Sequence, residues 1–256
     1  MKQTRNIRIM VNQRLSLLKH VELLQAQSHY LHNVMRCMPD DVIKCFNDRD
    51  GEFDCRIVSL DKNKVVIEPQ KHTRSAAAET DIWLVFAPLK KDKTDFVVEK
   101  SVEFGVSRII PVITEHTNVK NVKIERYISQ AIEASEQCGR LSVPTIDKAQ
   151  NLKEILSSWD KNRILYFMDE RRHGANVSEI FKQNSAKLSA ILIGPEGGFS
   201  DEEAKFLNAQ PYVCNVNLGP RILRAETAVA AALAVWQAIA GDWQNTKEIN
   251  HENINS

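Results

Sequence analysis

The chain has almost no net charge and few of the features that mark secreted, membrane-spanning or zinc-binding proteins. Its 34 basic and 33 acidic side chains leave a formal net charge of +1, so no strong field of the whole molecule attracts a polyanion. The five cysteines form no Cys-x-x-Cys pair, and no histidines stand at zinc-site spacing. This pattern predicts structural thiols in a reducing cytoplasm and no bound metal.

No apolar segment is long enough to span a bilayer. The first ten residues are polar and basic, which is unlike a signal peptide. The most apolar stretch, Ala225–Ala240, is interrupted by Glu226, Thr227 and Gln237 and falls short of a membrane span. It therefore indicates a buried helix, and we expect a cytoplasmic protein without a membrane partner.

The content of 43% hydrophobic and 26% charged residues is ordinary for a soluble protein, and 256 residues suffice for two modest domains. Short β-prone runs at residues 42–46, 54–60 and 64–68, the last two joined by Asp61-Lys62-Asn63, predict a hairpin and a small β-barrel over residues 1–72. The composition changes near residues 69–78. We expect a second domain over residues 73–245 and a polar tail at 246–256.

The second domain alternates between apolar runs and amphipathic segments. Near-continuous apolar runs are typical of strands that are covered on both faces. The alternation predicts an α/β domain with a mostly parallel sheet. Strands are expected at residues 81–87, 108–113, 163–168, 188–193 and 212–217, and helices at residues 91–104, 122–139, 201–209 and 225–240.

One loop of this domain, residues 194–200, reads Gly-Pro-Glu-Gly-Gly-Phe-Ser between an expected strand and an expected helix. Two glycines after Glu196 free the backbone to approach a ligand, and Ser200 is a candidate N-cap. Ligands of open α/β sheets bind at the carboxyl ends of strands, which favours a ligand site here. The loop lacks the phosphate-loop and dinucleotide-binding patterns. A tight turn without a ligand explains it equally well.

A second loop, residues 218–228, also leaves a strand and opens a helix. It contains Arg221 and Arg224 beside small and apolar residues, a combination that suits an anion or a charged substrate. The alternative is a helix start whose two arginines face solvent.

The front of the chain offers a local basic surface. Residues 1–38 contain one acid, Glu22, against Lys2, Arg5, Arg8, Arg14, Lys19 and Arg36. Such a surface contacts phosphates in nucleic-acid-binding proteins, but a solvated face has the same composition.

Taken together, residues 194–200 and 218–228 closely resemble the paired C-terminal motifs of the SPOUT class of methyltransferases, and within it the ribosomal RNA small subunit methyltransferase E family. Residues 29–36, 100–106 and 109–114 also resemble that family. Residues 134–140, Ala-Ser-Glu-Gln-Cys-Gly-Arg, are similar to its Glu-Gln-x-x-Arg signature. The resemblance covers nearly the whole chain and is weakest in the N-terminal strands.

The resemblance implies a PUA-like β-barrel followed by a SPOUT domain with a C-terminal trefoil knot, working as a homodimer. It implies S-adenosylmethionine as cofactor, 16S ribosomal RNA or the small ribosomal subunit as partner, and methylation of N3 of a uridine. Two alternatives stay open. One is an RNA-binding ribosome-assembly factor that has lost catalysis, and the other is a SPOUT enzyme that acts on another RNA.

The resemblance also suggests residue roles. We hypothesise that Glu196 is the base and that Arg224 stabilises the developing oxyanion, although Glu196 could instead cap a helix or bind the ligand. Phe199 is a candidate to receive the target base, and the alternative is that it belongs to the core. Expected cofactor contacts are Leu192, Ile193, Gly194, Glu196, Gly198, Leu218, Gly219, Ile222, Leu223 and Thr227. Expected RNA contacts are Arg8, Arg36, Lys90, Lys91, Lys93, Arg126, Arg140 and Arg221.

Overall fold

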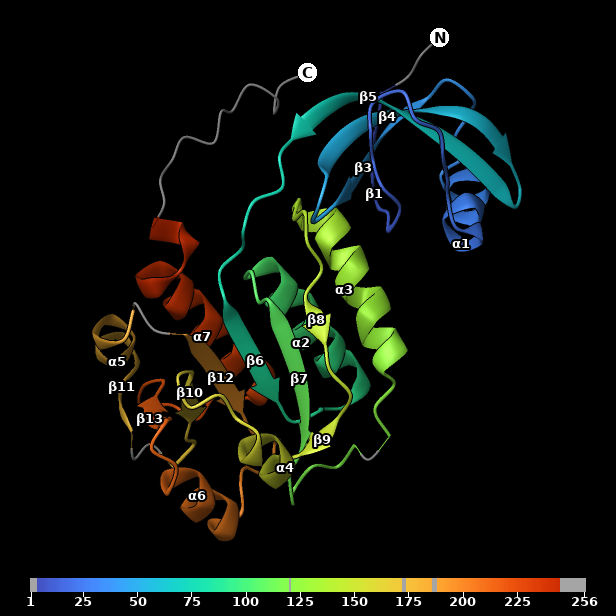
Figure 1. Ribbon diagram of the computed structural model, residues 1–256. Helices are drawn as coiled ribbons and strands as arrows, with labels where there is room; N and C mark the ends of the chain where they lie inside the picture. Colours follow the sequence, from blue (N-terminus) through green and yellow to red (C-terminus); the bar gives the residue numbers. More distant parts are fainter. Residues whose placement is uncertain (1–3, 120, 172–173, 186–187, 245–256) are drawn as a thin grey trace. The chain divides into compact units, whose positions relative to one another are not determined.

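The computed structural model describes residues 4–119, 121–171, 174–185 and 188–244 (Figure 1), so the expected tail at 246–256 lies outside the described residues. Contacts group the chain into two compact units. One consists of Met1–Glu79 with Ile132–Val143, and the other of Thr80–Ala131 with Pro144–Ser256.

The described residues of the first unit form a five-stranded mixed sheet in the order β1-β3-β4-β5-β2. The predicted hairpin is confirmed, with Asp61 opposite Lys64, but its strands are longer than expected. β1 was not predicted as a strand, and it pairs parallel with β3. The strands are β1 (Thr4–Met10), β2 (Val21–Glu22), β3 (Val42–Asn47), β4 (Gly51–Asp61) and β5 (Lys64–Arg74).

Alternating apolar side chains of these strands fill one core, which includes Ile9, Ile43, Ile57 and Ile67. The helix α1 (Gln25–His29) continues into a π-helical turn at Tyr30–Val34, whose Leu31 is fully buried against the same core.

Three of the five cysteines, Cys37, Cys45 and Cys55, lie in the core of the first unit and are free thiols. A hydrogen bond with Cys55, followed by burial, raises the pKa of the Cys45 thiol well above its ordinary value. The Cys45 thiol therefore stays protonated, and all three side chains pack as small apolar groups, as the sequence predicts.

A nearly buried carboxylate, Glu52, organises the charged side of this unit. The Nε of Arg8 donates to its Oε2 at 2.8 Å, and Lys44 Nζ lies 3.5 Å from its Oε1. Burial alone would raise the pKa of Glu52, but the hydrogen bond and charge of Arg8, with Lys44 and Thr73, bring it below its ordinary value of 4.5. Its ionised form therefore stabilises the fold above about that pH, and the contribution is lost as the pH falls further.

The described part of the second unit forms an eight-stranded parallel sheet, with the path β11-β13-β10-β12-β6-β7-β8 and β9 paired with β7. The predicted α/β class is confirmed. The sheet's strands are β6 (Ile82–Phe86), β7 (Arg108–Ile113), β8 (Thr145–Ile146), β9 (Gln150–Asn151), β10 (Ile164–Met168), β11 (Ala175–Asn176), β12 (Ser189–Ile193) and β13 (Val213–Asn217).

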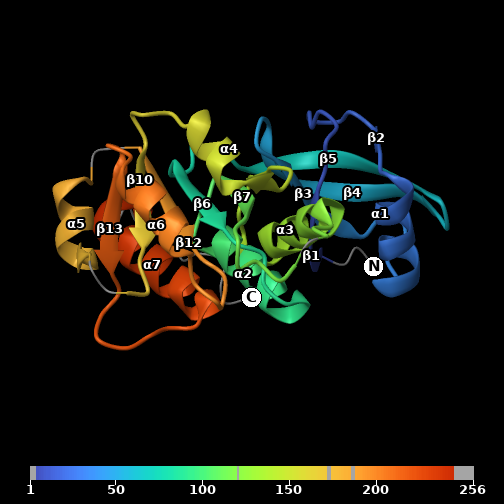
Figure 2. The same cartoon turned by 90° about the horizontal axis from the view of Figure 1, so that it is seen from below.

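Helices cover both faces of this sheet, which explains the unbroken apolar runs of its central strands. On one face of the sheet, Leu165 and Leu192 pack against α4 and α6. On the other face, Tyr166 packs on Phe181 of α5, and the helix α7 contacts α2, α5 and β12. Figure 2 shows α2 and α7 on the side of the sheet away from α4. The helices are α2 (Lys91–Glu103), α4 (Leu152–Ser157), α5 (Val177–Gln183), α6 (Asp201–Asn208) and α7 (Ala225–Ala240). The helix α3 (Ile124–Cys138) is divided, with its residues from Ile132 on belonging to the first unit.

The helix α7 agrees with its predicted bounds, and its buried face includes Val229, Leu233 and Trp236. No helix among the described residues is long and apolar enough to cross a membrane.

Replacing Arg8 with Met should lower the free energy of unfolding by roughly 3–5 kcal/mol, because Glu52 would keep its buried charge without its main partner. Arg14→Met is the matched control. The Arg14 side chain is 80% exposed and lies 3.8 Å from Asp50, so its loss should cost less than about 1 kcal/mol. Urea denaturation of both variants measures the difference, and equal losses would contradict a structural role for Arg8.

Candidate functional site

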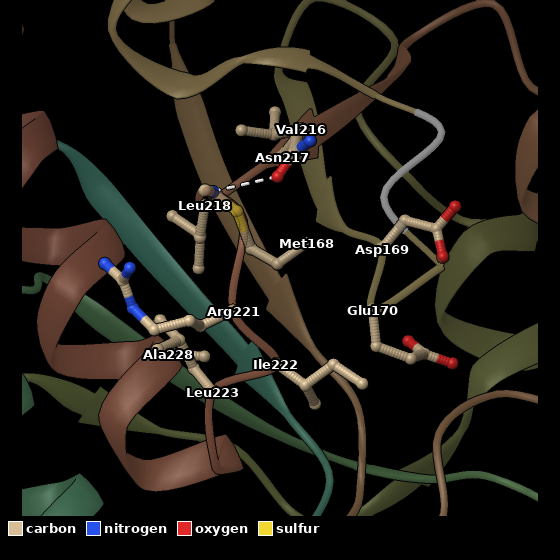
Figure 3. A pocket seen from close by; sticks show the side chains of 11 residues that line it. Met168, Asp169, Glu170, Val216, Asn217, Leu218, Arg221, Ile222, Leu223 and Ala228 are labelled. Carbon is tan, nitrogen blue, oxygen red and sulfur yellow. Dashed lines mark hydrogen bonds between the residues drawn. The ribbon is translucent and has the colours of Figure 1, made fainter.

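Three neighbouring strands, β10, β12 and β13, end at the same edge of the parallel sheet, so the loops that follow them meet. Two adjoining cavities lie among these loops, one of about 510 Å³ and one of about 50 Å³. Figure 3 shows the smaller cavity, with Glu170 and Arg221 on opposite sides of it. Both cavities are lined by Met168, Glu170, Ile222, Leu223 and Ala228.

The loop after β12 is a tight turn followed by a capped helix. The amide of Gly198, at φ +70°, donates to the carbonyl of Pro195 at 2.9 Å. The predicted N-cap is confirmed, because Ser200 Oγ accepts from the amide of Glu203 and the Glu203 carboxylate accepts from the amide of Ser200. The capping box fixes the start of α6 directly beside the turn.

The glycines of this loop make room for the protein's own side chains. A Cβ added at Gly194 would lie 2.5 Å from the Phe199 ring, and one at Gly198 would lie 2.3 Å from Glu170 Oε1. A Cβ at Gly197 would lie 3.2 Å from the Cβ of His116. Gly194 and Gly198 also line the larger cavity, so close approach of a ligand to this turn stays a prediction beside this packing role.

The loop after β13 leaves space open. The amide of Gly219, at φ +109°, donates to Asn217 Oδ1 at 2.8 Å, and a Cβ added there would meet no atom within 4 Å. Ile222 is 74% exposed and lines both cavities. An exposed apolar side chain beside a cavity is suited to covering a flat apolar ligand group.

Charges of both signs surround the larger cavity. Lys93 Nζ lies 3.2 Å from Glu196 Oε1 and 3.7 Å from Glu226 Oε1, so it links the loop after β12 to the first turn of α7. Arg224 occupies the N-cap position of α7 with an exposed side chain and lines the same cavity.

Most of the predicted cofactor residues line these cavities. Leu192 and Thr227 line neither, because Leu192 is fully buried within β12 and Thr227 is exposed on α7. Those that do are Ile193, Gly194, Glu196, Gly198, Leu218, Gly219, Ile222 and Leu223.

The end of β10 and the loop after it, which contribute Met168, Asp169 and Glu170, were not predicted from the sequence. A signal was present, since two acids directly follow an apolar strand. The rule that ligands bind at the carboxyl ends of parallel strands applies to that strand too.

Two predicted RNA contacts, Arg8 and Arg140, are corrected by the structure. The Arg8 side chain is 11% exposed and donates to Glu52 and to the carbonyls of Ser135 and Glu136. The Arg140 side chain is 6% exposed and pairs with Glu79 at 2.8 Å. Both guanidinium groups are held inside the first unit and lack the exposure that phosphate contact requires.

The other predicted RNA contacts differ in their surroundings. Arg126 is ion-paired with Asp95, and Lys93 with the two glutamates described above. The side chain of Lys91 lies outside the described part of the chain. Exposed side chains are found at Lys90, Arg221 and Arg36, the last at φ +50°.

Phe199, a candidate to receive the target base, is a core residue. It is 2% exposed and packs edge-on against Phe167, with ring centroids 5.0 Å apart. It is therefore not available as a stacking surface for a base.

Comparison with known proteins gives both halves of the chain a match. A family model described as an RNA methyltransferase domain matches residues 76–237, and one described as an RNA methyltransferase PUA domain matches residues 23–70. Ribosomal RNA small subunit methyltransferase E of Rickettsia conorii is 32% identical over 228 residues, which cover 89% of this chain and 93% of that protein. The Bacillus subtilis protein of the same name is 31% identical over 80% of this chain and 85% of its own length.

A solved structure of the same-named protein from Neisseria gonorrhoeae, bound to S-adenosyl methionine, superposes with a TM-score of 0.84 and 29% identity. It covers 93% of this chain, and this chain covers 99% of it. A methyltransferase from Legionella pneumophila, with the same cofactor bound, also gives a TM-score of 0.84.

The fold, the site and the two matched models define an RNA methyltransferase with an N-terminal PUA domain. Within that class, the chain belongs to the ribosomal RNA small subunit methyltransferase E family.

Gly194→Ala should lower the free energy of unfolding by roughly 1–3 kcal/mol, because the new methyl group must displace the buried Phe199 ring. Gly197→Ala is the matched control, since its methyl group meets only the exposed His116, and we expect a change below about 1 kcal/mol. Thermal unfolding of the two variants measures both effects. A more stable Gly194 variant would contradict the packing described for this loop.

Proposed function

We propose that this chain transfers the methyl group of S-adenosylmethionine to small-subunit ribosomal RNA, and that the cofactor occupies the cavity enclosed by the loops after β10, β12 and β13. The observation that carries the proposal is the meeting of these three loops around about 510 Å³, a volume in the usual range for small-molecule sites. The cofactor bound in the Neisseria gonorrhoeae relative supports the choice of ligand.

The chemistry of the lining suits this cofactor. S-adenosylmethionine supplies an electrophilic methyl carbon on a sulfonium, and it also carries an ammonium, a carboxylate and a flat adenine. Ile193, Leu218 and Ile222 are suited to cover the adenine, with backbone groups of Gly219 and Leu223 beside it. Carboxylates of Glu170 and Glu196 complement the cationic groups of the cofactor.

We assign roles in catalysis to Glu196 and Arg224, with N3 of a uridine in 16S ribosomal RNA as the methyl acceptor. That nitrogen carries a proton at neutral pH, which Glu196 is placed to accept at the cavity. The Lys93 ammonium shares the Glu196 carboxylate, so the approaching base must compete with this ion pair. Arg224 is placed to stabilise the negative charge that develops on the base carbonyls.

We assign RNA contact to the first unit, chiefly to residues 1–72. The exposed side chains of Lys90 and Arg221 in the second unit are assigned to RNA contact as well. Arg36 and Arg126 are further candidates. The name shared by the relatives supports ribosomal RNA as partner. Homodimer formation and a trefoil knot in the C-terminal part of the second domain belong to the same proposal, on the strength of the family resemblance.

Purified protein incubated with radiolabelled S-adenosylmethionine should label 16S ribosomal RNA, either free or in assembled small subunits. Mass spectrometry of nuclease fragments should locate the label on N3 of one uridine. Cofactor binding together with labelling of a different RNA would replace the substrate assignment. No cofactor binding, with retained affinity for the small subunit, would identify an assembly factor instead.

The same assay tests Arg224. Arg224→Ala should slow methyl transfer about 10²–10³-fold while changing cofactor affinity much less, because its partner charge appears only in the transition state. Arg221→Ala is the matched comparison: Arg221 is also exposed but lines only the smaller cavity, so its loss should weaken RNA binding and retain most of the catalytic rate at saturating RNA. A loss confined to cofactor affinity would move Arg224 from the catalytic step to the binding site.

A further inference from the structure

Side chains from two other loops hold the backbone of the turn after β12. His116 Nδ1 lies 3.1 Å from the carbonyl oxygen of Gly197 and 3.2 Å from that of Gly198. The amide of Phe199 donates to Glu170 Oε1 at 3.3 Å, and its carbonyl accepts from Arg171 at 2.9 Å. His116 follows β7, which lies two strands from β12, whereas Glu170 and Arg171 follow β10, which pairs with β12, so the turn is held from both sides of its strand.

The two consecutive glycines are what admit these side chains. A Cβ at residue 197 would make a tight contact with the Cβ of His116, and the Glu170 carboxylate occupies the place of a Cβ at residue 198. A pair of glycines would otherwise be the most flexible part of the loop. The hydrogen bonds replace the rigidity that the glycines remove.

His116 itself stands on a rigid support. Thr114 and Thr117 are buried and share a hydrogen bond between their hydroxyl groups at 2.8 Å. The amide of Thr117 donates to the carbonyl of Thr114, and the amide of Glu115 donates to Glu203 Oε1. The imidazole is exposed, so packing of the core does not explain its position.

We propose that His116 is a positioning residue of the cofactor site: its Nδ1–H holds the Gly197 and Gly198 carbonyls and so keeps Gly194 and Glu196 at the wall of the larger cavity. This role rests on the proposed function. Carbonyl oxygens only accept, so the ring must carry a hydrogen on Nδ1, as one neutral tautomer and the imidazolium both do. Without this donor the turn keeps only its bonds to Glu170 and Arg171 and moves more, so ordering it lowers the free energy gained on cofactor binding.

Two substitutions of His116 that are nearly isosteric with each other test the effect of the donated hydrogen. In His116→Asn an amide N–H can take the place of Nδ1–H, whereas His116→Asp offers only oxygens to the two carbonyls. We expect His116→Asn to bind S-adenosylmethionine within about twofold of the unchanged protein, and His116→Asp to bind about five- to tenfold more weakly. Isothermal titration calorimetry of the full chain measures both affinities.

Hydrogen exchange adds a readout that needs no cofactor. The amides of Gly198 and Phe199 should exchange faster in the His116→Asp variant than in the Asn variant, while the thermal unfolding midpoints of the two stay alike. Equal affinities and equal exchange for the two variants would overturn the positioning role. If the unchanged protein itself failed to bind S-adenosylmethionine, the proposed function would fall instead, and the exchange comparison would still decide whether His116 orders the turn.

Discussion

A parallel sheet carries the carboxyl ends of its strands to one edge, and the site depends on this constraint. Because β12 lies between β6 and β10, and β13 lies beyond β10, the loops after β10, β12 and β13 meet although their strands are up to about 50 residues apart in sequence. Each of the three loops makes a different main contribution to the site. The first brings carboxylates, the second a glycine-rich turn, and the third open space with arginines at its rim.

Close packing around the middle loop decides what its glycines do. Glycine in a loop at a strand end is usually attributed to approach by a ligand, but here Phe199, His116 and Glu170 occupy the space beside the three glycines. The loop is thus a rigid wall whose outer surface faces the cavity. Preorganisation of this kind reduces the ordering cost of binding and suits a reaction that depends on aligning donor and acceptor atoms.

The sequence predicted much of the second unit because its signals are local. Burial on both faces gives strands such as β12 unbroken apolar runs, and Gly105 marks the end of α2 with φ +73°. Contacts between distant residues carried no such signal. β1 pairs parallel with β3, and Arg8 bonds carbonyls 127 and 128 residues away, so its basic charge was interpreted as a nucleic-acid surface.

The candidate site shows the same division. The loops at residues 194–200 and 218–228 were predicted from their unusual content of glycine and arginine. The family resemblance indicated S-adenosylmethionine as their ligand. The loop with Asp169 and Glu170 has no distinctive composition, and its part in the site depends on strand order alone. His116 was missed for the same reason, since it contacts residues 81 and 82 positions away.

The most direct test of this account is a crystal structure of the protein with S-adenosylhomocysteine, the product form of the cofactor. We predict electron density in the larger cavity that reaches into the smaller one, with the adenosine against Ile222 and Leu218 and contacts to the loops after β10, β12 and β13. Density elsewhere, or in the cavity without contact to the loop after β10, would contradict the arrangement of the site.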